Sequence, residues 1–298
     1  MTTQQAEARY SWGADEFLLI EVDEEMSLEA NFLGHAMAAA LEARELPGVV
    51  DVAPSNAALL VRIDPDVIAP DELERTVRDI EAEARTTMTT TTETRIIEVP
   101  VWFDDPYTKE TAQRFREGFH QRPEGGDLDY AAEVNHLASA EEFIRRYHES
   151  PWIVSMVGFV AGIPWLYQLV DREHQLEVPK YKSPRTDTPE RTLGHGGCFG
   201  AIYAVRGAGG YQMFGIVATP VYEPEQRLAD FADFSVLFRP GDIVKFRPVD
   251  EAEYHRIRAE VEAGTYVYRK VPFTFDPGKA LADPARYNET ILEALHGA

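Results

Sequence analysis

The residues at 151–170 are PWIVSMVGFVAGIPWLYQLV, and none of them is charged. A run of this length is long enough to cross a bilayer. Gly158, Gly162, Pro164 and Gln168 interrupt it, however, and divide it into two short apolar segments. Such segments, separated by glycine and proline, are typical of two strands joined by a turn. We therefore expect a buried strand–loop–strand segment, with membrane insertion as the disfavoured alternative.

The same pattern of short apolar runs between glycines and prolines continues to Val249. It predicts a β-barrel or a β-sandwich. Before it, 96–103 is predicted as a strand and 139–148 as a helix, which Ser139 and Glu142 begin as a capping box. After it, 250–263 and 284–295 are predicted as helices.

The amino-terminal part has a different pattern. Strands are predicted at 17–22, 49–54 and 58–63, and helices at 27–44 and 70–85. The order strand, helix, strand, strand, helix predicts a small α+β sandwich with its helices on one face. The chain of 298 residues suits two domains.

The fold class expected is therefore α+β, a small α+β sandwich followed by a β-barrel. We expect the sandwich domain at 1–85, a linker at 86–94, the barrel domain at 95–250 and a helical carboxy-terminal extension at 251–298. The linker is rich in threonine, which also suits an edge strand.

The charge of the chain restricts its partners. It has 29 basic and 51 acidic residues and a net charge of −22, which argues against nonspecific binding to nucleic acid or to an anionic membrane.

The one cysteine, Cys198, excludes an intrachain disulfide and a zinc site built on several cysteines. We expect no metal. The first residues do not resemble a signal peptide, so a cytoplasmic location is expected.

The segment GHGGCFG at 194–200 is the densest in glycine. Glycines allow a ligand to approach the backbone closely and expose amides that can bind an anion or an oxyanion. The alternative is a sharp turn between two strands. His195 can act as a general base near neutral pH, or it can be a hydrogen-bonded structural residue.

Two further groups are candidates. Lys180, Lys182 and Arg185 form a basic cluster that can hold a carboxylate or a phosphate, or can form salt bridges to the acidic surface. The aromatic residues Trp165, Tyr167, Tyr203 and Tyr211 suit a core, and one or two of them can line a pocket. Cys198 has no activating feature and suits a buried position.

Three motifs resemble the allophanate hydrolase subunit 1 family. The segment GFVAGIPWL at 158–166 resembles its Gly-Phe-x-Pro-Gly-Phe-Pro-Tyr-Leu motif. Pro179, the Pro184-Arg185 pair and Pro189 follow its proline–arginine segment, and RPGDIVKFRP at 239–248 resembles its closing Pro-Gly-Asp motif. The family includes the B component of 5-oxoprolinase, the Kip inhibitor of a sporulation kinase, and the first half of the carboxyltransferase domain of urea carboxylase.

The resemblance implies a cyclophilin-like barrel and a second cyclophilin-like chain, the subunit 2 homologue, as partner. It implies ATP or biotin chemistry that resides in partner subunits, with no cofactor bound by this chain. The chain would be a subunit of an amide or lactam hydrolase, or of a biotin-dependent carboxyltransferase. In the expected site, Lys180 and Arg185 hold an anion or oxyanion, and His195 transfers a proton. The loop amides of Gly196 and Gly197 are oxyanion donors, and the substrate contacts are Phe199, Tyr203 and Tyr211.

Some positions depart from the family pattern. Phe199-Gly200-Ala201 stands where the family has Gln-Thr-Gly. The position of an arginine in the family pattern falls near Ile216 in this chain. Each missing hydrogen-bond partner costs a polar ligand about 1–3 kcal/mol. The sequence therefore predicts a less polar substrate than urea or 5-oxoproline. The alternative is a non-catalytic regulatory protein of the Kip inhibitor type.

Overall fold

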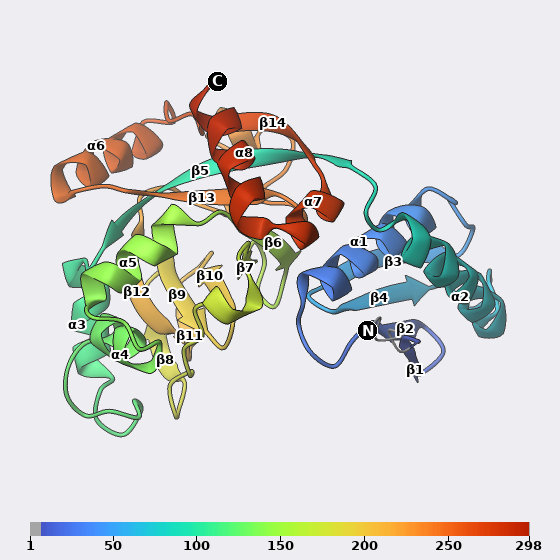
Figure 1. Cartoon of the computed structure of the whole chain (residues 1–298), viewed down its shortest axis with the longest axis horizontal. Coiled ribbons are helices and arrows are strands. Elements are labelled where there is room, and N and C mark those ends of the chain that lie inside the picture. The colour runs from blue at the N-terminus through green and yellow to red at the C-terminus, as the bar shows by residue number, and fades with distance from the viewer. Residues whose placement is uncertain (1–6, 298) are drawn as a thin grey trace. The chain divides into compact units, whose positions relative to one another are not determined.

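The computed structural model describes residues 7–297, which form two compact units (Figure 1). Among the described residues, the first unit is 7–92 with Thr274–Ala282, and the second is Glu93–Phe273 with 283–297. Each unit has a hydrophobic core cluster of its own.

The first unit is a four-stranded antiparallel sheet covered by helices. Its strands in sheet order are β1 (Arg9–Gly13), β2 (Phe17–Glu21), β4 (Ala58–Ile63) and β3 (Val49–Ser55). Its helices are α1 (Leu28–Glu42), α2 (Pro70–Thr87) and the short α7 (Pro277–Ala282).

Alternation along the strands explains why the helices cover one face. Leu18 and Ile20 in β2 are fully buried, whereas Leu19 between them is 36% exposed. Helix α1 begins where predicted, because the Ser27 side chain accepts a hydrogen bond from the Ala30 amide at 3.0 Å. The predicted order of strands and helices is confirmed. Strand β1 was not predicted, because none of its residues is fully buried.

The second unit contains a closed seven-stranded barrel. Its strands run in the order β12, β9, β10, β7, β6, β13 and β5, and the barrel closes because β12 also pairs with β5. The bounds are β5 (Thr92–Phe103), β6 (Trp152–Val157), β7 (Pro164–Gln168), β9 (Thr192–Gly196), β10 (Phe199–Ile202), β12 (Gln212–Val217) and β13 (Ile243–Pro248). Strand β14 (Lys270–Phe275) adds to β5 outside the closed ring, and β8 (Arg185–Thr188) pairs with β11 (Gly207–Gly209) as a separate ribbon. The predicted α+β class with a barrel is confirmed.

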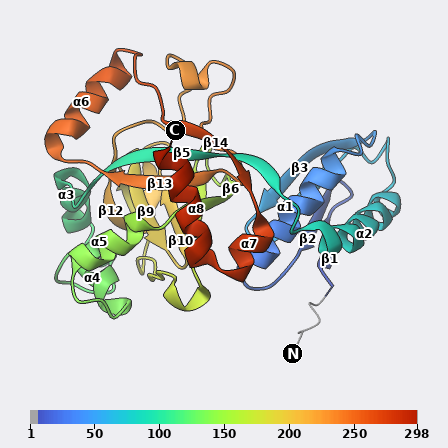
Figure 2. The ribbon, with the colours of Figure 1, turned by 45° about the horizontal axis from the view of Figure 1, so that its top comes forward.

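Helices surround the barrel. Helices α3 (Pro106–Arg114), α4 (Asp127–Val134) and α5 (Ala140–Glu149) gather on one side of it, where they contact β12 and β13 (Figures 1 and 2). Helices α6 (Glu251–Glu262) and α8 (Pro284–His296) follow the barrel strands in sequence. Among residues 7–297, no helix is long and apolar enough to cross a membrane.

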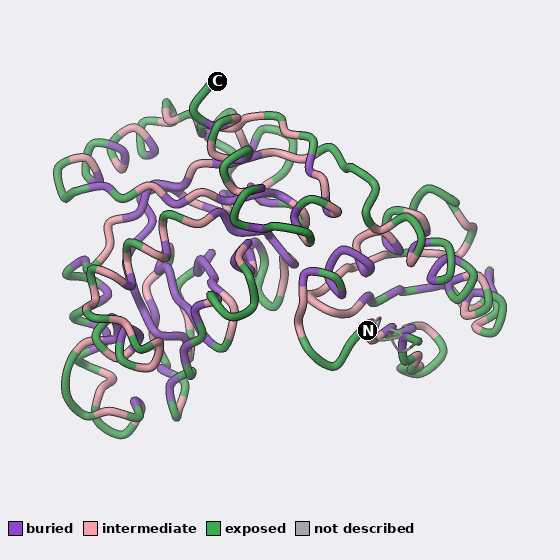
Figure 3. Tube along the Cα trace, viewed as in Figure 1, coloured by how far each residue is buried: buried purple, intermediate pink, exposed green. Residues whose placement is uncertain are grey.

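The uncharged run at 151–170 forms the hairpin of β6 and β7, as expected. Trp152 on β6 is fully buried, and its ring centroid lies 4.5 Å from that of Tyr147 and 6.2 Å from that of Phe246. Buried residues follow the barrel strands in this way around the ring (Figure 3).

Two segments differ from the expected arrangement. In the threonine-rich stretch, α2 continues to Thr87 and β5 begins at Thr92, so the part outside regular structure is short. The carboxy-terminal segment is not entirely helical, because it contains strand β14, which pairs with β5. It is also divided between the units, because α7 belongs to the first one.

Candidate functional site

The glycine-rich segment forms the β9–β10 hairpin. Gly196 pairs with Phe199 across a two-residue turn, where Gly197 adopts a φ of 63°. The amide of Gly197 donates to the Val178 carbonyl at 2.7 Å, and the Val178 amide returns a bond of 2.9 Å. The structure thus pairs the Gly197 amide with Val178 in an isolated bridge outside the named strands, instead of leaving it free as the oxyanion donor that we expected.

Neighbouring side chains leave no room for a Cβ atom at Gly196. A Cβ atom at this position would lie 2.3 Å from Cδ1 of Tyr211 and 2.9 Å from Cγ of Lys180. The tyrosine ring therefore lies directly on the backbone of β9, and only glycine allows this approach.

His195 lies inside the barrel. It is fully buried, and its Nε2 is 3.0 Å from the Leu176 carbonyl oxygen and 3.1 Å from that of Gly197. Two acceptors at one nitrogen fix the proton on Nε2, while Nδ1 faces the Tyr147 hydroxyl at 3.4 Å. Burial lowers the pKa of His195 to about 4. Its burial and its hydrogen bonds are those of the structural alternative that the sequence left open, since both ring nitrogens face groups of the chain itself.

Arg185 is also fully buried, at the start of β8. Its Nε donates to the Thr188 hydroxyl at 3.3 Å, and its guanidinium carbon lies 4.3 Å from the centroid of the Tyr181 ring. Tyr203 is 8% exposed, and a Cβ atom on Gly209 would lie 2.2 Å from its hydroxyl. Both residues were expected to contact substrate, but they are enclosed in the interior.

The structure brings four other residues together, which we call the Lys180 face: Lys180, Trp165, Phe199 and Tyr211. The exposed Lys180 places its Nζ 5.3 Å from the centroid of the Tyr211 ring. Tyr211 packs edge-to-face on Trp165 at 5.5 Å, and Trp165 packs in the same way on Phe199 at 5.9 Å. Trp165 and Phe199 are half-buried. The Lys180 face is thus a cation beside partly open aromatic rings.

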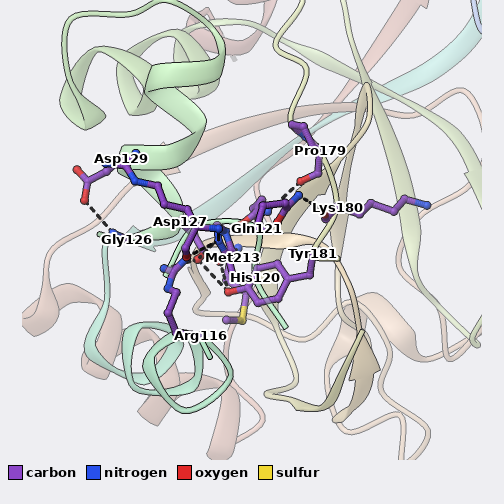
Figure 4. A network of polar contacts seen from close by, with 12 residues as sticks. Arg116, His120, Gln121, Gly126, Asp127, Asp129, Pro179, Lys180, Tyr181 and Met213 are labelled. Carbon is purple, nitrogen blue, oxygen red and sulfur yellow. Dashed lines mark hydrogen bonds and ion pairs between the residues drawn. The ribbon is translucent and has the colours of Figure 1, made fainter. Parts of the chain in front are cut away.

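A buried polar network holds the backbone on either side of Lys180 (Figure 4). The Gln212 side chain donates to the Pro179 carbonyl at 2.9 Å, and the Gln121 side chain donates to the carbonyl of Lys180 itself. The Tyr181 hydroxyl lies 2.8 and 2.9 Å from the two carboxylate oxygens of Asp127. Lys180 is therefore held at its own residue and at both neighbours.

Asp127 is the centre of this network, and we did not predict it. It also accepts hydrogen bonds from Arg116 and from the Met213 amide, both at 2.9 Å. It lies at the start of α4, directly after Gly125-Gly126. A carboxylate in the first turn of a helix is the signal that could have marked it.

A cleft of about 610 Å³ borders the network at Arg116 and Asp127. It is lined by residues from α3, α4, α5 and β12 and includes none of the predicted site residues. Within residues 7–297, no group of three or more His, Cys, Asp or Glu residues could hold a metal ion.

This barrel and sandwich define a carboxyltransferase-type fold. Residues 8–231 match the family model described as carboxyltransferase domain, subdomain C and D. The chain belongs to this family, as the resemblance of its motifs predicted.

The relatives are enzymes or enzyme subunits. The chain is 28% identical over 255 residues to the B component of 5-oxoprolinase from Bacillus subtilis (strain 168), covering 83% of this chain and 95% of that one. It is 24% identical over 270 residues to the urea amidolyase of Saccharomyces cerevisiae, covering 90% of this chain but 15% of that enzyme.

A solved structure gives the same fold. The crystal structure of Kluyveromyces lactis urea carboxylase matches with a TM-score of 0.81 at 24% identity, over 98% of this chain and 26% of that one. The chain thus spans nearly all of one relative and a minor part of the other two.

Proposed function

We propose that this chain is a subunit of a heteromeric ATP- or biotin-dependent enzyme that acts on an amide, a lactam or a related carbonyl compound. The observation that carries the proposal is the match over 95% of the 5-oxoprolinase B component. Because the chain spans only 15% of the yeast urea amidolyase, the ATP or biotin chemistry would belong to partner chains. The expected partner is the subunit 2 homologue, and the expected location is the cytoplasm.

In this proposal the Lys180 face meets the substrate. Lys180 is exposed, so its ammonium can hold a carboxylate or a developing oxyanion without first breaking a buried contact. Its position beside the Tyr211 ring is worth about 0.5–1 kcal/mol at an exposed site. That attraction favours conformations of the flexible Lys180 side chain in which the ammonium lies beside the Tyr211 ring.

The aromatic rings support a less polar substrate. Phe199 and Trp165 offer apolar surface next to the ammonium. At the next position, a Cβ atom on Gly200 would lie 2.5 Å from the Tyr147 hydroxyl, so a larger polar side chain does not fit there. These residues suit a substrate with an anionic or carbonyl end and an apolar body.

The test is turnover by the reconstituted enzyme. The chain is coexpressed with the subunit 2 homologue and with any ATPase or biotin carboxylase encoded beside it, and ATP-dependent turnover is measured over a panel of amides and lactams. We expect Lys180→Met to lower kcat/KM at least tenfold. The matched control is Lys182→Met, two residues away and also exposed, which should change kcat/KM less than twofold.

Equal effects of the two substitutions would refute the role of Lys180. Copurification of the two subunits without any turnover, combined with inhibition of a protein kinase, would instead favour the Kip inhibitor alternative.

A further inference from the structure

A second cavity, of about 200 Å³, lies in the barrel unit and shares no residue with the Lys180 face. It is lined by the turn between β8 and β9, the segment at 220–228 and helix α6. Two arginines from distant parts of the sequence meet at it, Arg191 from the turn and Arg258 from α6.

These two guanidinium groups are largely enclosed. Their side chains are 14% and 20% exposed, for Arg191 and Arg258 respectively. Burial lowers the pKa of Arg258, and the positive charge of Arg191 lowers it further. Two like charges that repel each other in a poorly hydrated place favour an anion between them.

The contacts that the pair makes within the described residues are long. Arg191 Nη1 is 3.4 Å from the Tyr254 hydroxyl, and its buried Nε has no hydrogen-bond partner among residues 7–297. Arg258 Nη1 is 3.3 Å from the Ala218 carbonyl oxygen. The hydrogen bonds of Arg191 Nη1 and Arg258 Nη1 are thus long, and the Nε of Arg191 makes none within residues 7–297.

The carboxylates nearby do not satisfy the pair. Glu190 lies 3.4 Å from Arg191 Nε and is 56% exposed, and Glu262 lies 3.8 Å from Arg258 and is 73% exposed. Such exposed pairs contribute little. The buried Glu223 also lines the cavity, but it accepts from both the backbone and the side chain of Arg227.

The backbone at Arg191 favours glycine. Its φ is 65°, in the left-handed region, and the turn is held by a bond of 2.6 Å from its amide to Tyr203 and one of 2.8 Å from Val217 to its carbonyl. A long cationic side chain thus occupies a position where glycine would be less strained.

We propose that Arg191 and Arg258 form a binding site for a small oxyanion, a phosphate or a carboxylate group. Guanidinium groups bind both through paired N–H donors. The cavity is smaller than the roughly 300–1,000 Å³ typical of drug-sized ligands, so it suits a single anionic group instead of a nucleotide. This site does not depend on the proposed function.

The test measures anion binding to the full chain with inorganic phosphate and, separately, acetate, at an ionic strength held constant with NaCl. Thermal unfolding and titration calorimetry should reveal saturable binding of at least one of the two anions. Arg191→Gly and Arg258→Met should each weaken it at least tenfold. Arg256→Met is the matched control, because Arg256 lies on the same helix but is 57% exposed and pairs with Glu260.

Arg191→Gly also separates binding from folding. Because glycine suits the left-handed backbone, the Tm of this variant without anion should stay within a few degrees of the wild type. The proposal is overturned if neither anion shifts the Tm beyond NaCl alone, or if the double variant Arg191→Gly, Arg258→Met binds as the wild type does.

Discussion

The buried His195 should make the barrel unit sensitive to acid. In the folded chain its pKa is about 4, against the ordinary 6.5, because burial disfavours the charged ring. Below pH 6.5 the unfolded chain therefore binds a proton at this residue that the folded chain does not bind. Stability from this residue is complete above pH 6.5 and is lost as the pH falls towards 4.

The size of the loss follows from the two pKa values. One pKa unit is worth about 1.4 kcal/mol. Lowering the pH from 6.5 to about 4 thus removes about 3 kcal/mol from the free energy of unfolding. In His195→Gln the loss should be absent, because the glutamine amide is neutral at every pH and can still donate to the Leu176 or Gly197 carbonyl.

The assay is urea unfolding at several pH values from 7.5 to 4.5, followed by tryptophan fluorescence. A Trp12→Phe background removes the tryptophan of the first unit, so the remaining ones report on the barrel unit. The other ionisable groups are the same in the wild type and in His195→Gln, so their contribution to the pH dependence of stability cancels in the comparison. If the two lose stability in parallel as the pH falls, His195 is not buried as a neutral donor and the reasoning fails.

Three further perturbations test the packing around the barrel. Gly215→Ala should destabilise the chain by about 3 kcal/mol or prevent folding, because its Cβ would lie 2.6 Å from a backbone oxygen where β12 closes on β5. The control is Gly207→Ala, which should change the Tm little, because no heavy atom lies within 4 Å of the added Cβ. Tyr181→Phe removes the hydroxyl that donates to Asp127 and should cost about 1–3 kcal/mol in urea unfolding. Burial raises the pKa of the Cys198 thiol, so its alkylation by iodoacetamide at pH 8 should be slower than that of free cysteine.

Most elements could be predicted because their signals are local. Ser27 marks the start of α1 through its own hydroxyl, and the alternation of Leu18, Leu19 and Ile20 gives the buried face of β2. Strand β14 could not be predicted in this way, because it is defined by pairing with β5, which is distant in the sequence.

The candidate site was harder to predict, because burial depends on contacts between distant segments. Residue type alone suggested His195 and Arg185, but both side chains are fully buried. Asp127 was missed, since its link to Tyr181 joins residues 54 positions apart. Lys180 was proposed because its charge is unusual in an acidic chain, and the structure leaves its side chain exposed, so it stays a candidate.

Gly196 and Gly200, near the proposed site, leave room for neighbouring side chains because they have none of their own. Gly196 leaves room for both the Tyr211 ring and the stem of Lys180, since a Cβ atom would lie 2.3 Å from the ring and 2.9 Å from Cγ of the lysine. Gly200 leaves room for the Tyr147 hydroxyl in the same manner. The Tyr211 ring and the stem of Lys180 therefore both lie close to the backbone of β9 at Gly196. A dense run of glycines can thus indicate where aromatic rings lie on a strand, and the residues that those rings support are the ones to examine for binding.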